Sequence, residues 1–303
     1  MNLSLHHGPL TFSALEAGAG PIVLCLHGFP DHKGSFRFLL PALAAAGYRA
    51  VAPTMRGYEP SAQPEDGDYH LSAIAGDVLS WIEELGGQPV HLVGHDWGAV
   101  VGYLVAAMAP EKLRSLTTLA IANPGRMQSE LWRRRPSQLR KSWYMFYFQL
   151  RGIADRAVER QDWALIERLW REWSPGFELP PEEMRQVKDT LAQPGVKQAA
   201  LGYYRAMFAL LAPANREAQR YYGQKYQVPT LAITGALDGC MDTRLHDDLM
   251  HASDFPAGLE VVRVEGAGHF LHQERPDEIN AQLLRWIARW SPGGAGRPDP
   301  PPG

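Results

Sequence analysis

An aspartate stands between two glycines at the point where an apolar run gives way to a helical pattern. The stretch GHDWG has Asp96 at its centre, with Gly94 and Gly98 on either side. A tight turn from strand to helix is a common place for a catalytic nucleophile, and small residues leave room for its course. A carboxylate there is ionised near neutral pH, so it can attack carbon without a base. The alternative reading is a helix N-cap aspartate that has no chemistry.

Two further side chains could complete a catalytic set with Asp96. His269 follows the last strand-like run, in GAGHF, and Asp238 follows the run before it, in GALDG. Histidine acts as a general base when an acid orients its imidazole. At the other position that such an acid occupies, after the strand at 115–122, this chain has Asn123. Asp238 is therefore the candidate acid.

Short β-rich runs alternate with amphipathic stretches at both ends of the chain. This alternation predicts an α/β fold with a mostly parallel sheet flanked by helices, and it places His269 on a loop at the carboxyl end of the sheet. The expected strands cover residues 21–26, 48–53, 89–94, 115–122, 228–234 and 259–264. The expected helices cover residues 35–47, 72–87, 98–110 and 275–290.

A long helical segment interrupts this alternation. From about residue 125 to residue 225 the chain is aromatic and charged, with helical patterning and no clear strands. We therefore expect a core formed by residues 1–124 and 226–290, and an inserted helical cap formed by residues 125–225. The Pro/Gly-rich tail, residues 291–303, is expected to be disordered.

Composition and charge narrow the class of protein. The 303-residue chain has a formal net charge of −3, which gives no electrostatic case for a nucleic-acid partner. Its basic run at residues 133–141 fits a solvated helix face. The chain shows no signal peptide and no apolar run near the roughly 18 residues of a membrane span. We therefore expect no membrane partner. With only two cysteines, Cys25 and Cys240, the chain fits a reducing compartment, so we expect a cytoplasmic protein.

The chain resembles the soluble epoxide hydrolases of the α/β-hydrolase fold. The matching segments span nearly the whole expected core: HGFP (27–30), MRGYEPS (55–61), GHDWG, GALDG and GAGHF. Glu59 departs from the family's usual glycine and is expected to affect a loop rather than a catalytic group. The resemblance implies an α/β-hydrolase core with an inserted helical cap.

The resemblance also implies roles for backbone amides and cap tyrosines. The N–H groups of Phe29 and Trp97 would form an oxyanion hole. Two tyrosines would hold the epoxide oxygen: Tyr144 in SWYMFYFQL and Tyr204, directly before Arg205, in GYYRAM. The neighbouring tyrosines, Tyr147 and Tyr203, remain alternatives for these two positions.

The expected reaction opens a small apolar epoxide to a vicinal diol. Asp96 would form an alkyl ester, and a water activated by His269 would hydrolyse it. We expect substrate and water as the partners and no cofactor. A metal is not expected either, because His91 and His95 lie on a strand and turn rather than on one helix face. The sequence carries no sign of the oligomeric state.

Two other functions remain as alternatives. A haloalkane dehalogenase shares the aspartate nucleophile, and its halide binds to an indole such as that of Trp97. That family usually has Asn where Phe29 stands, and a halide needs no paired tyrosines. A non-catalytic binding protein on a hydrolase fold is disfavoured because every catalytic role has a candidate. A serine esterase is weaker still, since the chain contains no Gly-x-Ser-x-Gly.

Overall fold

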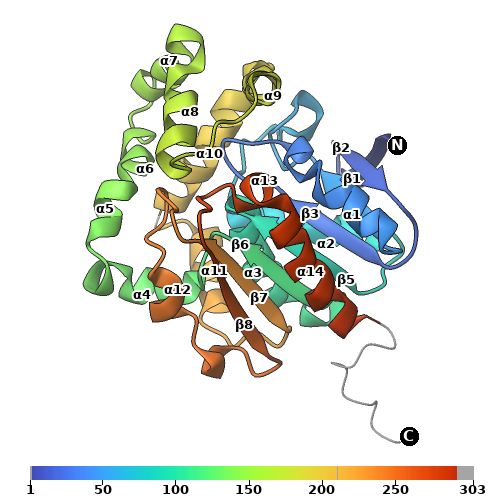
Figure 1. Cartoon of the computed structure of the whole chain (residues 1–303). Coiled ribbons are helices and arrows are strands. Elements are labelled where there is room, and N and C mark those ends of the chain that lie inside the picture. Colours follow the sequence, from blue (N-terminus) through green and yellow to red (C-terminus); the bar gives the residue numbers. More distant parts are fainter. Residues whose placement is uncertain (1, 210, 292–303) are drawn as a thin grey trace, which may run out of the picture.

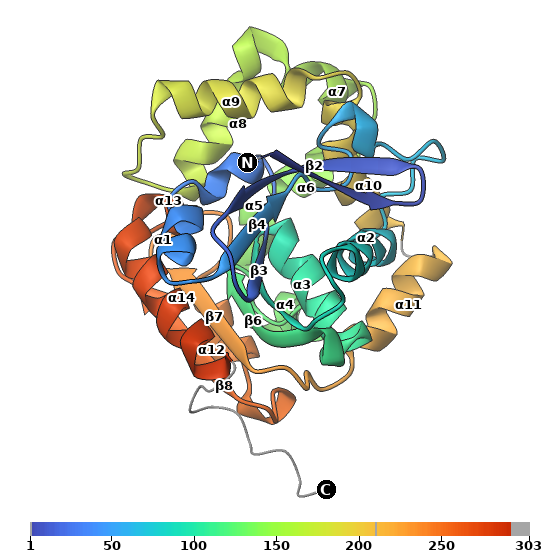
Figure 2. The same ribbon diagram turned by 90° about the vertical axis from the view of Figure 1, so that its right-hand side faces the viewer.

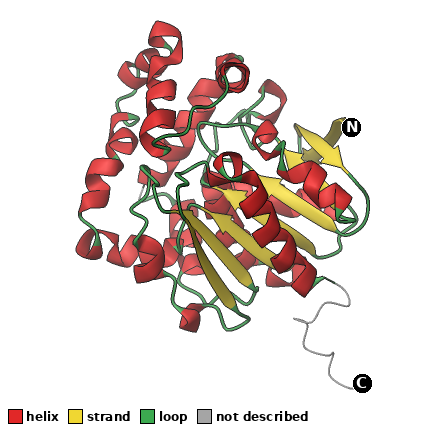
Figure 3. Cartoon of the chain, viewed as in Figure 1, coloured by secondary structure: helices red, strands yellow, loops and turns green. Residues whose placement is uncertain are grey.

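A single sheet forms the centre of the molecule. The computed structural model describes residues 2–209 and 211–291, and within them eight strands pair in the order β1-β2-β4-β3-β5-β6-β7-β8 (Figures 1 and 3). Strands β1 and β2 are antiparallel to their neighbours, whereas the pairs from β4 to β8 are parallel. The predicted mostly parallel sheet flanked by helices is confirmed.

All six predicted strands are present, and none of their ends is shifted by more than three residues. They are β3 Ile22–Leu26, β4 Arg49–Pro53, β5 Val90–His95, β6 Leu113–Leu119, β7 Thr230–Gly235 and β8 Leu259–Val264. The sequence analysis missed the amino-terminal hairpin of β1 Asn2–His7 and β2 Leu10–Ala17. In β2 the buried residues Leu10, Phe12 and Ala14 alternate with partly exposed ones, and this period of two could have revealed the strand.

Helices cover both faces of the sheet. Figure 2 shows α1 Leu39–Ala45 and α14 Pro276–Trp290 on one side, and α2 Leu71–Glu84 and α3 Trp97–Met108 on the other. Each pair packs its apolar side chains into a separate buried cluster against the sheet. Two short helices, α12 Leu245–Leu249 and α13 Leu271–Glu274, follow β7 and β8. The layers thus bury both faces of the parallel strands.

Helices inserted between β6 and β7 form a second layer beside the sheet (Figure 1). We call residues 125–225 the cap. Its last helix, α11, lies against the core helices α2 and α3. The bounds are α4 Pro124–Arg134, α5 Ser137–Lys141, α6 Trp143–Tyr147, α7 Ile153–Val158, α8 Arg160–Trp173, α9 Pro181–Ala192, α10 Val196–Phe208 and α11 Pro213–Tyr222.

Glu59 has a structural role where the resembling family has glycine. Its backbone φ is −151°, an extended value that requires no glycine. Its carboxylate accepts hydrogen bonds from the backbone N–H and the hydroxyl of Ser13 on β2. Glu59 therefore fastens its loop to the sheet.

The tail that was expected to be disordered, residues 291–303, is described only at its first residue. Ser291, the first residue of the expected tail, donates a hydrogen bond to the carbonyl of Ile287 at the end of α14. The rest of that tail lies outside the described residues.

Among the helices that are described, none combines the length and apolarity needed to cross a bilayer.

Candidate active site

Asp96 occupies a strained turn between β5 and α3. Its backbone angles are φ 50° and ψ −118°, in a region that non-glycine residues avoid at a cost of about 1–3 kcal/mol. The turn is too tight for side chains at its flanks: a Cβ on Gly94 would lie 2.3 Å from the carbonyl oxygen of Gly98, and one on Gly98 would lie 2.1 Å from that of Leu26. The flanking glycines therefore permit the turn that presents Asp96.

The carboxylate of Asp96 does not cap its helix. It makes no capping hydrogen bond to α3, although Asp96 stands at the N-cap position. Instead, the backbone N–H of Phe29 donates to Asp96 Oδ1 at 2.8 Å. This approach requires Gly28, because a Cβ there would lie 2.4 Å from the same oxygen. The N-cap interpretation is therefore wrong, and the side chain is held by the loop after β3.

The Trp97 amide is the second group expected in an oxyanion hole. Trp97 is the first residue of α3, so its N–H has no carbonyl within the helix to bond to. Its amide is therefore available to a further acceptor, whereas the Phe29 amide already donates to Asp96. The helix end also favours negative charge there.

The structure brings His269 and Asp238 together behind Asp96. His269 Nδ1 lies 2.9 Å from Asp238 Oδ2, and His269 Nε2 lies 3.6 Å from Asp96 Oδ2. The second oxygen of Asp238 accepts from the backbone N–H groups of Cys240 and Met241, at 2.7 and 2.8 Å. Asp238 therefore orients His269, whose free nitrogen faces Asp96.

Electrostatic coupling keeps Asp96 charged and its histidine basic. Burial alone would raise the pKa of Asp96, but close contact with His269 outweighs burial and lowers it. For His269 burial acts in the opposite direction, yet the carboxylates of Asp238 and Asp96 raise its pKa from 6.5 to about 10. The His269 imidazole therefore interacts with two buried carboxylates, those of Asp238 and Asp96.

A polar link between the end of α8 and the loops that carry Asp238 and His269 was not predicted from the sequence. The carbonyl of Trp173 accepts from the N–H of Gly239 at 2.9 Å and from that of His269 at 3.0 Å. The next residue, Ser174, accepts from the N–H of Phe270 at 3.1 Å and donates to Glu274. One turn of the cap therefore holds both the loop that carries Asp238 (the acid loop) and the loop that carries His269 (the histidine loop). No motif marks this turn, because its key acceptor is a backbone carbonyl.

A second missed group lies beside the triad. Among the described residues Asp31, His95 and His272 are buried and place possible metal-ligating atoms within 4.8 Å of one another. His95 Nε2 donates to the carbonyl of His269 at 3.0 Å. This group could hold a metal ion, which the sequence analysis did not expect. It does not line the substrate cavity, so we route no step of the reaction through it.

A cavity of about 510 Å³ opens above Asp96 between the core and the cap. Four methionines line it, at positions 127, 145, 207 and 241, together with aliphatic and aromatic side chains. Asp96 is the one charged residue among the described residues that line it. A cavity of this kind suits an uncharged, apolar molecule.

The cavity distinguishes between the candidate tyrosines. Tyr144 and Tyr204 line it, with their ring centroids 5.6 Å apart, whereas Tyr147 and Tyr203 do not. The hydroxyl of Tyr203 donates to the carbonyl of Arg56 at 2.7 Å. Within the described part of the chain, the buried Tyr204 hydroxyl makes no hydrogen bond of good geometry, and the Trp97 indole is the donor beside it. The geometry therefore favours Tyr144 and Tyr204 as the pair facing a substrate.

Both cavity tyrosines remain protonated. Burial raises the pKa of Tyr144 and of Tyr204 well above 10. The Tyr144 hydroxyl lies 3.3 Å from the sulfur of Cys240, which also lines the cavity. Each phenol can therefore donate to an oxygen that develops negative charge.

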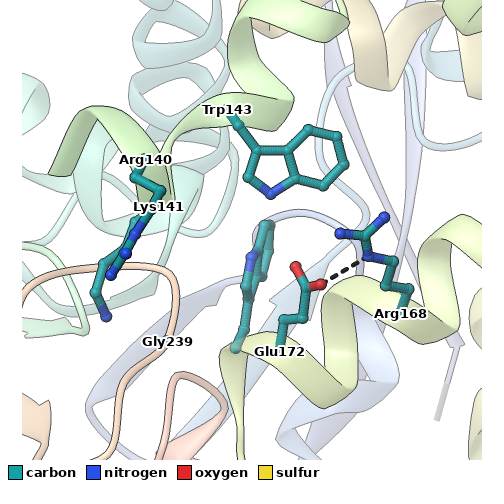
Figure 4. Close-up of a pocket in the computed structure, with 7 residues that line it drawn as sticks. Arg140, Lys141, Trp143, Arg168, Glu172 and Gly239 are labelled. Atoms are coloured by element: carbon teal, nitrogen blue, oxygen red, sulfur yellow. Dashed lines mark hydrogen bonds and ion pairs between the residues drawn. The ribbon is translucent and has the colours of Figure 1, made fainter. Parts of the chain in front are cut away.

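A smaller cavity of about 290 Å³ lies on the outer side of the acid loop (Figure 4). Its wall includes Trp143, the ion pair of Arg168 with Glu172, and Gly239. Lys141 donates to the carbonyls of Asp238 at 2.7 Å and Met241 at 3.3 Å. On this side, too, a cap residue ties down the loop that carries Asp238.

The chain is similar to known hydrolases over nearly its whole length. A family model described as alpha/beta hydrolase fold matches residues 21–276. Epoxide hydrolase 3 of Siraitia grosvenorii is 30% identical, covering 95% of this chain and 98% of that protein. An epoxide hydrolase of Caballeronia sordidicola is 30% identical over 92% of this chain and 91% of that one. The crystal structure of epoxide hydrolase VrEH1 from Vigna radiata is 28% identical, with a TM-score of 0.79 over 95% of this chain and 97% of that chain.

Proposed function

This chain belongs to the α/β-hydrolase fold family and, within it, to the epoxide hydrolases, and we propose that it opens a small apolar epoxide through a covalent ester on Asp96. The observation that carries the mechanism is the state of the Asp96 carboxylate. It is buried, charged and uncapped, and it forms part of an apolar cavity that two protonated tyrosines also line. A carboxylate in that position can attack an alkyl carbon.

In the first step, Asp96 Oδ2 attacks a ring carbon and the carbon–oxygen bond of the epoxide breaks. The released oxygen stays attached to the substrate as an alkoxide. Tyr144 and Tyr204 hold it by hydrogen bonds, and one of them supplies its proton. Such general-acid assistance contributes about 10²–10⁴-fold to a rate.

In the second step, His269 takes a proton from water and the hydroxide adds to the carbonyl carbon of Asp96. The resulting oxyanion is on Asp96 itself, where the amides of Phe29 and Trp97 stabilise it. The ester bond then breaks, and His269 returns its proton to the departing diol oxygen. The second proton of the water restores the tyrosine.

The test is the loss of diol formation in Asp96→Asn. The variant keeps the shape of the side chain but lacks an anionic nucleophile, so we expect diol formation to fall to the background rate. Gas chromatography of the diol from styrene oxide measures this directly. A pure, folded preparation of the variant with undiminished turnover would overturn the assignment of Asp96.

Dehalogenation is the second candidate, and one observation favours it. The indole nitrogen of Trp97 is buried and makes no hydrogen bond of good geometry among the described residues, although the Tyr204 hydroxyl lies beside it. It could therefore bind a halide leaving from a cavity-bound molecule. Parallel assays with styrene oxide, a bromoalkane and a p-nitrophenyl ester separate the hydrolase reactions. We expect turnover of the epoxide alone.

A further inference from the structure

Positive charge is concentrated in two segments of the cap. Residues 125–160 contain nine Lys or Arg against three Asp or Glu, and residues 205–225 contain four against one. Their formal charges are therefore +6 and +3, although the whole chain carries −3. The rest of the molecule accordingly carries −12. Ion pairs with Asp254, Asp248 and Asp155 neutralise Arg126, Arg135 and Arg205. The other basic side chains of these segments point to a negatively charged partner.

The same segments expose large apolar side chains. Among the described residues eight large hydrophobic side chains are exposed, and five of them lie in these segments. Ile153 is 62% exposed and Leu150 is 49% exposed, and both lie next to exposed arginines, Arg151 and Arg156. The remaining three are Leu139, Phe146 and Leu211. Exposed apolar and basic side chains therefore lie close together along these segments and contribute to a common surface.

This surface continues into the entrance of the substrate cavity. Phe146 on α6 lines the cavity and is 44% exposed, and its ring lies 5.4 Å from that of Phe208 at the end of α10. The contact joins the two basic segments at the cavity. Figure 1 shows α4, α5, α6 and α7 following one another along a single outer edge of the molecule. We call the exposed side chains of residues 125–160 and 205–225 the entrance surface.

We propose that the entrance surface docks on an anionic lipid bilayer, from which the apolar substrate enters the cavity. Basic side chains are attracted to anionic headgroups, and exposed apolar side chains insert among the acyl chains. A nucleic acid would account for the arginines but not for Leu150 and Ile153 between them. The reason for docking rests on the proposed function, because an apolar epoxide concentrates in lipid rather than in water.

The expectation of no membrane partner rested on the lack of a spanning segment. A missing span excludes crossing a bilayer but not binding to its surface. The net charge of −3 also concealed the asymmetry, since the acidic residues of the core outnumber the basic residues of the cap. The arrangement of charges around the cavity entrance became visible only in the folded chain.

Vesicle co-sedimentation of the whole chain tests the proposal without any turnover. We expect binding to phosphatidylcholine vesicles that contain about 30% phosphatidylglycerol, and at least about tenfold weaker binding to pure phosphatidylcholine. Binding should weaken when NaCl is raised from about 0.05 M to about 0.5 M, because salt screens surface charge. Asp96→Asn should bind as the wild type does, so failure of docking and failure of catalysis are distinguishable.

Matched variants locate the surface. Arg151→Glu with Arg156→Glu should reduce binding about tenfold or more, whereas Arg185→Glu with Arg285→Glu changes the net charge equally on other faces and should have little effect. Leu150→Ser with Ile153→Ser should also reduce binding. Its control is Phe38→Ser with Val261→Ser, which removes comparable exposed side chains elsewhere.

Three outcomes would overturn the proposal. The first is equal or absent binding to both kinds of vesicle. The second is equal loss in the entrance-surface variants and their controls, which would show that only net charge or folding matters. The third is tighter binding of duplex DNA that depends on Arg151 and Arg156 but not on Leu150 and Ile153, which would assign the surface to nucleic acid.

Discussion

The two oxygens of Asp96 have different surroundings, and these assign them different tasks. Oδ1 accepts the Phe29 N–H at 2.8 Å, whereas Oδ2 lies 3.6 Å from His269. In the proposed mechanism, the oxygen already held by the amide becomes the oxyanion of the second step. Oδ2 is then the oxygen that we propose attacks the epoxide and later leaves in the diol.

We predict that pH separates the two steps. The pKa of Asp96 is low, so ester formation should change little between about pH 5 and pH 9. The pKa of His269 is raised partly by the charge of Asp96, and the ester removes that charge. The pKa of His269 then falls, and ester hydrolysis should quicken as pH rises through this lower value. Stopped-flow tryptophan fluorescence resolves the two phases.

The variant His269→Gln is the control for this prediction. His269→Gln should form the ester and retain it, so mass spectrometry should find the alkyl group on the peptide that contains Asp96. A hydrolysis phase that slows as pH rises would contradict the role of His269 as base. So would a variant that shows no adduct.

The neighbouring tyrosines Tyr203 and Tyr204 should behave differently. Tyr204→Phe removes a phenol that faces the cavity, so we expect ester formation to slow by about 10²-fold. Tyr203→Phe removes the hydrogen bond to the Arg56 carbonyl, so it should lower the free energy of unfolding by about 1 kcal/mol and leave ester formation nearly unchanged. Rapid-quench kinetics and urea denaturation measure these effects. Slower ester formation in Tyr203→Phe, with loss of stability alone in Tyr204→Phe, would assign the substrate-facing role to Tyr203.

For single residues, the sequence predicted which positions matter better than it predicted where their side chains point. The motifs located Asp96, Asp238 and His269 because each follows a strand of the sheet. The sequence could not decide between Tyr203 and Tyr204, since adjacent residues on a helix differ only in direction. That direction depends on how α10 packs against the core.

Among the elements, the end of α8 connects the cap to the catalytic loops. Trp173 accepts hydrogen bonds from the loop of Asp238 and the loop of His269, and Ser174 is held by Glu274. The cap therefore does more than cover the cavity. The end of α8 holds the loops of Asp238 and His269 at a fixed separation. The strands β7 and β8, which precede these loops, hold them on the other side.

We predict that Ser174→Ala weakens this connection. The change leaves the Phe270 N–H and the Glu274 carboxylate each short of a buried partner, which should cost about 1–3 kcal/mol in the free energy of unfolding. Hydrolysis of the ester should slow about tenfold because His269 is less well placed. Denaturation and single-turnover kinetics measure the two effects.

Ser129→Ala is the matched control. Ser129 is exposed and its hydroxyl bonds only to the backbone of its own helix, so the effect on stability should stay within about 0.5 kcal/mol. Equal effects of the two substitutions would show that the α8 turn has no special role.

The elements themselves were predictable to different degrees. The parallel strands could be identified because short, nearly continuous apolar runs mark strands buried on both faces. The hairpin of β1 and β2 was missed, since its polar residues interrupt such runs. The first predicted helix was too long, because residues 33–36 form a separate 3₁₀ turn ahead of α1.

For the whole molecule, the insertion creates the cavity and its charge pattern. The core supplies Asp96 and the oxyanion amides, whereas the cap supplies both tyrosines and most of the apolar wall. The sequence predicted an insertion at residues 125–225, and helices do lie between β6 and β7. It could not show that α11 packs against α2 and α3, because helical patterning does not tell which neighbour a helix contacts.

The position of the oxygen from water tests the central claim most directly. A single turnover in H₂¹⁸O, with enzyme in excess, should place ¹⁸O in the Asp96 carboxylate and leave the first diol unlabelled, because water attacks the carbonyl carbon of the ester. Mass spectrometry of the peptide that contains Asp96 and of the diol measures both. A labelled diol and an unlabelled peptide would mean that water attacks the epoxide directly, and would contradict the covalent mechanism.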